Sequence, residues 1–221
     1  MTTRHILSNA MRLLVAAACV VTASGCGSEL LRTGHAPMML VIRSIQASSG
    51  GSTTPSFVST LQSDVQVLVR TTVNSVEIVT PTIFNDLVQV SLDLIQKDQS
   101  GLLPGSAARS TSPINDVTLT RYRVSFRRSD GHNTPGVDVP FGFDGALTTT
   151  ISPGGGAVIF DLVRHQAKLD PPLRNLIGFK GLVFISTVAE ITLWGRDQNG
   201  NEVTATGSID VQFADFGDPS S

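Results

Sequence analysis

The sequence predicts an all-β fold, an antiparallel β-sandwich of about nine strands with little helix. Apolar residues recur at every second position in several segments, which is the period of a strand with one buried face. Segments rich in Gly, Pro, Ser, Asn and Asp separate these strands and favour turns. Helix signals are confined to two short stretches, residues 57–61 and residues 170–177, where Asp170 precedes two prolines.

The clearest pair of strands lies at residues 183–213. Within residues 203–213, one face is apolar and the other is polar. The apolar face is formed by Val203, Ala205, Gly207, Ile209, Val211 and Phe213. Residues 183–193 alternate in the same way, and Asn199-Gly200 between the two segments favours the positive φ of a tight turn. We therefore expect an antiparallel hairpin here.

Shorter alternating segments predict the other strands. They are residues 38–45, residues 65–69 paired with 76–79, residues 88–94, and residues 147–151 facing 158–162 in a second hairpin. Residues 48–55 and 99–113 are rich in Ser, Gly and Pro, so we expect loops there.

One predicted strand changes its buried face along its length. Val117 and Leu119 share one parity, whereas Tyr122, Val124 and Phe126 share the other. A shift of one residue moves every following side chain to the opposite face. We expect either a β-bulge near Arg121 or a strand that passes from one sheet to the other.

The N-terminal residues have the pattern of an export signal. Arg4 and Arg12 precede an unbroken apolar run at residues 13–21, and small residues follow it. A membrane-spanning helix needs about 20 apolar residues, so the shorter run favours a cleaved signal. A start at Met11 would also give a complete signal.

Residues 23–26, Ala-Ser-Gly-Cys, resemble the bacterial lipobox, although Leu is commonest where this chain has Ala23. The resemblance implies that Cys26 is lipidated and becomes the mature N-terminus, held at the membrane by acyl chains. Gly27, in place of a retaining Asp, implies the outer membrane rather than the inner membrane. The alternative is an ordinary signal peptide, with Cys26 incidental.

These observations divide the chain into a signal peptide (1–25), a tether (26–37), a β-sandwich domain with long loops (38–216) and a disordered tail (217–221). Cys26 is the only cysteine after residue 25, so the mature domain has neither a disulfide nor a cysteine-based metal site. Removal of Arg4 and Arg12 changes the formal net charge from −2 to −4. An acidic chain with few charges gives no support for nucleic-acid binding.

The richest candidate for a ligand surface is a loop at residues 127–145, because loops on a rigid scaffold often carry binding residues. Its candidate residues are Arg127, Arg128, Asp130, His132, Asn133, Asp138 and Asp144. The three carboxylates of this set would suit Ca²⁺, but their spacing matches no ion-binding loop. The favoured alternative is a turn at Asp130-Gly131 followed by an ordered surface loop.

Other polar positions give weaker signals. Residues 197–202 partly match a calcium loop, but Gly200 is fourth rather than sixth, and a hairpin turn explains them. His35, His132 and His165 have no spacing that indicates a metal site. The chain has no nucleophile elbow, P-loop or dinucleotide-binding motif, so we expect no catalytic residues, metal or cofactor.

The segment at residues 193–213, LWGRDQNGNEVTATGSIDVQF, resembles the last hairpin of bacterial immunoglobulin-like or fibronectin-III-like domains. The whole pattern is similar to uncharacterised bacterial lipoproteins. The resemblance implies a sandwich but no activity, since such folds host many functions. We expect a non-catalytic binding or structural role in the cell envelope, with an envelope protein or glycan as partner. The alternatives are a hydrolase of an envelope polymer and a calcium-dependent adhesion module.

Overall fold

The computed structural model describes residues 35–52, 54–97 and 113–216. The predicted signal peptide, Cys26, most of the predicted tether, most of the predicted loop at residues 99–113 and the predicted tail therefore lie outside the described residues. The described chain is mostly strand, which confirms the predicted all-β class. The strands are β1 (Met38–Ser48), β2 (Thr60–Asp64), β3 (Val67–Val73), β4 (Val76–Thr82), β5 (Asp86–Gln96), β6 (Val117–Arg127), β7 (Phe143–Ile151), β8 (Gly156–Val163), β9 (Phe184–Asp197) and β10 (Glu202–Ala214).

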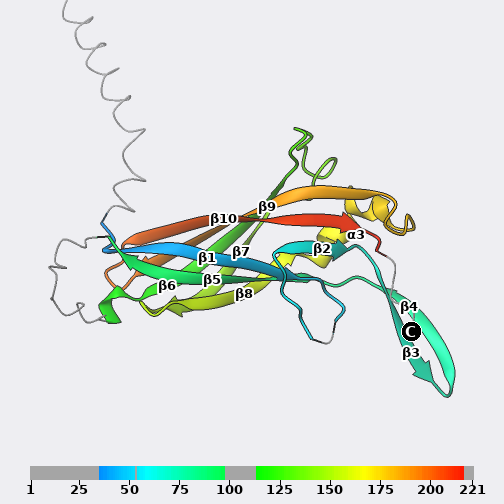
Figure 1. The fold of residues 1–221 in the computed structure, drawn as a ribbon, viewed down its shortest axis with the longest axis horizontal. Coiled ribbons are helices and arrows are strands. Elements are labelled where there is room, and N and C mark those ends of the chain that lie inside the picture. The colour runs from blue at the N-terminus through cyan, green and yellow to red at the C-terminus, as the bar shows by residue number, and fades with distance from the viewer. Residues whose placement is uncertain (1–34, 53, 98–112, 217–221) are drawn as a thin grey trace, which may run out of the picture.

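Two sheets form a sandwich-like body, and a third sheet projects from it (Figure 1). The smaller sheet has the order β1-β5-β8, and the larger has the order β2-β10-β9-β6-β7. Buried apolar residues from both sheets form one core cluster, as alternation on each strand requires. Pairing is antiparallel except between β2 and β10, which run parallel.

The predicted hairpin at residues 183–213 is confirmed as β9 and β10. Its register runs from Glu202 opposite Arg196 to Ala214 opposite Phe184. The turn is held by Asp197, whose side chain accepts hydrogen bonds from the amides of Asn199 and Asn201. Gly200 has a φ of +84°, the conformation that the Asn-Gly pair favours.

The predicted irregularity in β6 is also confirmed. The register against both β7 and β9 shifts between Leu119 and Arg121, which is the expected β-bulge. The residues on both sides of the bulge are buried, so the extra residue reconciles the two parities. On the outer face, the Arg121 guanidinium lies 4.0 Å from the centroid of the Trp194 ring.

Two local predictions are wrong. The strands at residues 147–151 and 158–162 do not pair with each other, because β7 pairs with β6 in the larger sheet and β8 pairs with β5 in the smaller one. The chain crosses between the sheets at Ser152-Gly155, where a single bridge forms. Residues 57–61 form no helical turn; they lead into β2, whose partner β10 is distant in sequence and leaves no local signal.

Helix is limited to short pieces, as expected. A 3-10 helix, η2 (Leu173–Leu176), forms inside the predicted stretch, and its N-cap is Pro172 rather than Asp170. The α-helix α3 (His165–Leu169) was not predicted, because five residues are too few to show helical periodicity. A further 3-10 turn, η1 (Pro113–Asn115), precedes β6.

A buried ionic cluster joins α3 to the sandwich. Lys168 Nζ donates to Asp86 Oδ1 and to the Asp64 carbonyl, both at 2.8 Å. Asp86 also accepts from Ser63 Oγ at 2.6 Å and from the Gly50 amide at 2.8 Å. The Lys168 and Asp86 side chains are 1% and 0% exposed, so this cluster fixes α3 against the start of β5 from inside the core.

The β3–β4 hairpin forms the projecting sheet. It leaves the body just after β2 and returns just before β5, and Figure 1 places it at the end opposite to the start of β1. Among the described residues its sheet has no third strand. Because Asp64 and Asp86 flank it, the buried cluster holds both of its ends.

Candidate functional site

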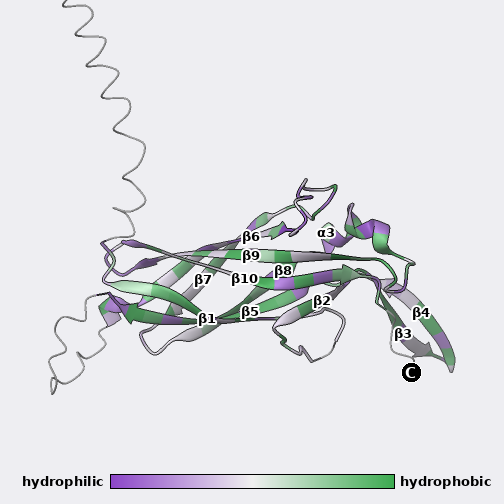
Figure 2. Ribbon diagram, turned by 45° about the horizontal axis from the view of Figure 1, so that its top comes forward, coloured by the Kyte–Doolittle hydropathy of each residue, from purple (hydrophilic) through white to green (hydrophobic). Residues whose placement is uncertain are grey.

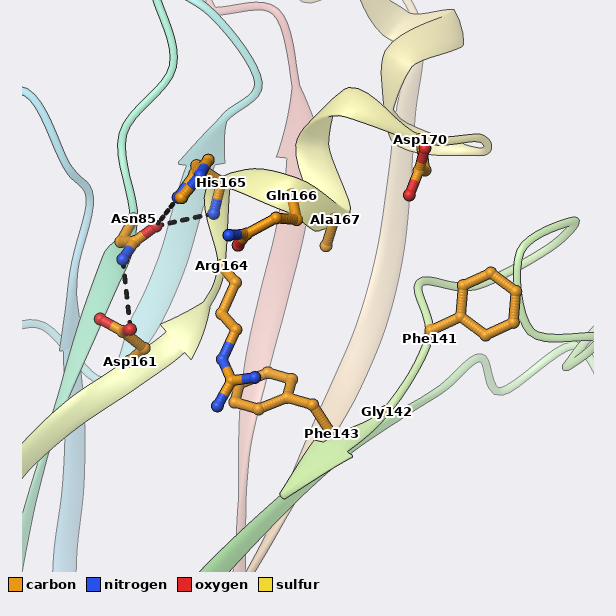
Figure 3. A pocket seen from close by; sticks show the side chains of 10 residues that line it. All are labelled: Asn85, Phe141, Gly142, Phe143, Asp161, Arg164, His165, Gln166, Ala167 and Asp170. Carbon is orange, nitrogen blue, oxygen red and sulfur yellow. Dashed lines mark hydrogen bonds between the residues drawn. The ribbon is translucent and has the colours of Figure 1, made fainter. Parts of the chain in front are cut away.

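A polar and aromatic pocket lies beside α3 (Figure 3). Its volume is about 460 Å³, within the range of small-ligand sites. Three segments form it: Asn85 before β5, residues 141–143 before and at the start of β7, and residues 161–170 from the end of β8 through α3. No one segment of the sequence carries the site, so spacing alone could not predict it.

His165 is oriented by a chain of hydrogen bonds. Its Nδ1 lies 2.9 Å from Asn85 Oδ1, which also accepts from the His165 amide at 2.7 Å, and Asn85 Nδ2 donates to Asp161 Oδ2 at 3.2 Å. If the Asn85 side-chain amide were reversed, its NH₂ group would face the His165 backbone N–H and its oxygen would face the Asp161 carboxylate. The amide orientation is therefore fixed, and Nδ1 must carry the proton that Asn85 accepts. Nε2 is then the ring nitrogen that takes no part in this chain of hydrogen bonds.

Arg164 forms the floor of the pocket with Phe143. Its guanidinium carbon lies 3.9 Å from the ring centroid, and one NH₂ group donates to the Asp144 carbonyl at 3.0 Å. Phe143 in turn meets Tyr122 edge-on, with 6.1 Å between ring centroids. Tyr122 is buried and contacts Phe160, so the stack under Arg164 rests on the core.

Phe141 forms the opposite wall, across from Gln166 and Asp170 in Figure 3. The residue is 60% exposed, which is unusual for so large an apolar side chain. The backbone of Gly136 supports the ring: a Cβ at that position would lie 2.5 Å from it. The end of the ring therefore lies against Gly136, at the edge of the pocket.

The predicted ligand loop is largely closed on itself. The Arg128 guanidinium donates to Asp130, and Arg128 and Asn133 exchange backbone and side-chain hydrogen bonds. Asp138 accepts from the Thr134 amide at 3.0 Å. These contacts order the loop through hydrogen bonds among its own residues.

Two carboxylates in this loop have a lowered pKa. The hydrogen bond from the Arg128 side chain is the main reason why the pKa of Asp130 lies below its usual value. The Thr134 amide has the same effect on the pKa of Asp138. Both side chains thus remain ionised and engaged within the loop.

The remaining candidate residues lie apart from this turn. Asp144 belongs to β7 and forms an ion pair with Arg123 on β6 at 2.9 Å, so the structure does not bring it to Asp130 or Asp138 as a shared cation site. Arg127 is exposed at the end of β6, and the His132 ring approaches Asp130 at 3.6 Å. Within the described ranges, no group of three or more His, Cys, Asp or Glu residues is placed to hold a metal ion.

The β3–β4 hairpin is the second candidate surface. By its register, one face carries only β-branched side chains and no charge. These are Val67, Val69, Thr71, Val73, Val76, Ile78, Thr80 and Thr82. Around the tip, Val73, Val76 and Ile78 are between 47% and 62% exposed. The other face carries the ion pair between Arg70 and Glu77, at 2.7 Å. Figure 2 shows apolar colour along much of both strands.

A second hollow, of about 520 Å³, lies beside the end of β1 and is lined mainly by Ser, Thr and Gln without a charged side chain. None of the helices in the described part of the chain has the length and apolarity that crossing a bilayer requires. Scans of protein-family models, curated proteins and solved structures found no match to this chain.

Proposed function

We propose that this protein is an exported lipoprotein, anchored through an acylated Cys26, that binds an envelope protein through its β3–β4 hairpin. The role is non-catalytic. The anchor rests on the signal-like residues 1–25 and the lipobox resemblance at residues 23–26. Gly27 favours the outer membrane.

The observation that carries the binding role is the uncharged β-branched face of the hairpin. A two-stranded hairpin alone is marginally stable in water, and exposed apolar strands promote pairing or docking. Here one face has no charged side chain, while the other carries the ion pair together with Leu68 and Val79. A partner that covers this face would remove Val73, Val76 and Ile78 from water without burying a charge.

The position of the hairpin suits a partner away from the anchor. The tether would enter the domain at β1, and the hairpin lies at the far end of the sandwich (Figure 1). An anchored domain would thus present the hairpin outwards rather than to its own membrane.

The hairpin is tested by photo-crosslinking in intact cells. A crosslinking amino acid at Ile78 should give a discrete adduct with an envelope protein, whereas the same group at Thr72 on the opposite face should not. Val76→Lys should abolish the Ile78 adduct, because the partner would have to bury a charge. No adduct, equal adducts from both faces, or an adduct only with a second copy of this chain would overturn the proposal.

The anchor is tested separately by intact mass of the N-terminal peptide from the membrane fraction. A peptide that begins at Cys26 with added acyl mass, absent from Cys26→Ser, is the expected result. An unmodified thiol or cleavage elsewhere would overturn the lipoprotein assignment.

A further inference from the structure

We propose that the pocket beside α3 binds an acidic pyranose, a sugar ring that carries one carboxylate, as found in hexuronic acids. The inference concerns a surface separate from the hairpin and does not depend on the proposed protein partner. It rests on one oriented cation, a set of hydroxyl-binding groups and one exposed aromatic ring in the same pocket.

The cation is Arg164. Five other arginines in the described ranges pair with carboxylates, namely Arg43, Arg70, Arg123, Arg128 and Arg196. Arg164 is half-buried, and no salt bridge links it to a carboxylate of a described residue. Stacking on Phe143 and one hydrogen bond to the Asp144 carbonyl fix its plane. A guanidinium has five N–H donors, so donors remain for a carboxylate that enters the pocket.

The polar groups around Arg164 suit hydroxyls. Nδ1 of His165 is committed to Asn85, which leaves Nε2 for a hydrogen bond to a hydroxyl. Gln166 offers a donor and an acceptor, and Asp170 offers acceptors at the rim (Figure 3). A hydroxyl can donate to one such group and accept from another, which lets a single sugar ring satisfy several of them.

The aromatic wall suits the apolar face of the ring. Phe141 stands across the pocket from Gln166 and Asp170 in Figure 3, and its 60% exposure leaves its face available for C–H groups. An aromatic wall with a few placed polar groups is the usual composition of a small-ligand site.

The acidic residues of the pocket limit the charge of the ligand. Asp161 and Asp170 both line it, and Asp161 is hydrogen-bonded by Asn85. Because these two carboxylates outweigh the single guanidinium, a phosphorylated or multiply charged ligand would be repelled most strongly. A ligand with one carboxylate must place it directly at Arg164, with its hydroxyls towards Asp170 and Gln166.

The test titrates the full-length protein in detergent with a matched pair of probes. Methyl galacturonide and methyl galactoside differ only by a carboxylate in place of CH₂OH at C6. Backbone amide shifts at Phe141, His165 and Gln166 report binding. We expect the galacturonide to bind about tenfold more tightly than the galactoside, the preference that one charge-assisted contact provides.

Variants assign the effect to the pocket. Arg164→Gln should remove the preference for the galacturonide, and Phe141→Ala should weaken both sugars; Arg174→Gln, an exposed arginine outside the pocket, should change neither. Phe141→Ala keeps the test valid if Arg164→Gln disturbs the stack on Phe143. Failure of both sugars to bind, equal affinities, a loss in Arg174→Gln, or tighter binding of N-acetyl-alanyl-alanine, which has a carboxylate but no hydroxyls, would overturn the proposal.

Discussion

Lys168 is a fully buried cation whose side chain is satisfied at both a carboxylate and a carbonyl. Removing two charges from water costs several kcal/mol per ion, and the pair recovers this only with good geometry and further hydrogen bonds. Asp86 receives three donors, from Lys168, Ser63 and Gly50, and no buried side-chain polar atom among the described residues lacks a partner.

Replacing Lys168 by Met should therefore destabilise the protein by about 3–5 kcal/mol, because Asp86 would remain buried without its counter-charge. Denaturant unfolding followed by circular dichroism measures the change. Lys180→Met, at an exposed lysine, is the control and should have little effect. The double variant Lys168→Met with Asp86→Asn should recover part of the loss. A loss below about 1 kcal/mol for Lys168→Met, the size of an ordinary surface change, would contradict this account.

Gly145 is required for space rather than for backbone conformation. A Cβ there would lie 2.1 Å from Cε1 of Tyr122, whose ring is packed 4.2 Å from that of Phe160. Gly145→Ala should cost about 1–3 kcal/mol through overpacking. Gly154→Ala is the matched control, because nothing lies within 4 Å of its added Cβ. Equal melting temperatures for the two variants would show that Tyr122 can move aside.

The lowered pKa values of Asp130 and Asp138 predict that acid destabilises the loop that contains them. Both have a folded-state pKa below the usual value of 3.8, so their hydrogen bonds stabilise the loop above the unfolded pKa. That contribution is lost as the pH falls through the lowered folded pKa values. In an NMR titration, the His132 and Thr134 amides should shift with midpoints below 3.8. Asp138→Asn should remove the Thr134 transition and keep that of His132; midpoints at or above 3.8 would refute the prediction.

Among the elements, sequence predicts best where partners are near in the chain. The β9–β10 hairpin and the bulge at Arg121 both follow from the alternation of apolar and polar residues. This alternation, and the point where it is interrupted, can be read from consecutive residues. The β3–β4 pair is confirmed for the same reason. For β7 and β8, alternation predicts the strands, but it does not indicate which sheet each strand joins.

The pocket could not be predicted because its groups come from distant segments. Asn85 and His165 lie 80 positions apart, and they meet only because β5 pairs with β8. Arg164 carries no motif, and its lack of a carboxylate partner in the described structure becomes informative only once its neighbours are known. The predicted loop contributed the neighbouring Phe141 and Phe143 rather than its charged residues.

The β3–β4 hairpin should be the least protected sheet of the described structure. Its side chains are largely exposed, whereas β9 contributes Ala189, Ile191 and Leu193 to the core. Hydrogen exchange should therefore be faster in residues 71–80 than in residues 187–195 by several orders of magnitude, since hairpin opening leaves the core intact. In the presence of a bound partner the hairpin amides should become protected. Equal protection in the isolated protein would contradict the marginal stability assigned to the hairpin.

At the scale of the whole molecule, the second strand and the last strand of the described chain pair in the same sheet. Among the described strands, β2 lies at the edge of its sheet and has β10 as its one neighbour, with Thr60 paired to Asp210. β10 also supplies the fully buried Val211 and Phe213. The sandwich is therefore closed by its C-terminal strand.

A chain that ends at Ser208 should not fold to a stable domain. It would lose the five β2–β10 pairs together with Ile209, Val211 and Phe213 from the core. Loss of the cooperative thermal transition is expected, and protease resistance checks it independently. A chain that ends at Phe216 retains all of β10 and is the control, which should melt like the full-length protein.

The parallel pairing of β2 with β10 also sets an order in time. Synthesis proceeds at about 5–20 residues per second, and β10 lies 150 positions after β2 in the sequence. The strand β10 is therefore made about 8–30 s after β2. Lys168, the counter-charge for Asp86, also emerges long after it. The protein therefore spends nearly its whole synthesis without a closed core. The arrangement that gives the finished domain its stability thus postpones that stability until the chain is nearly complete.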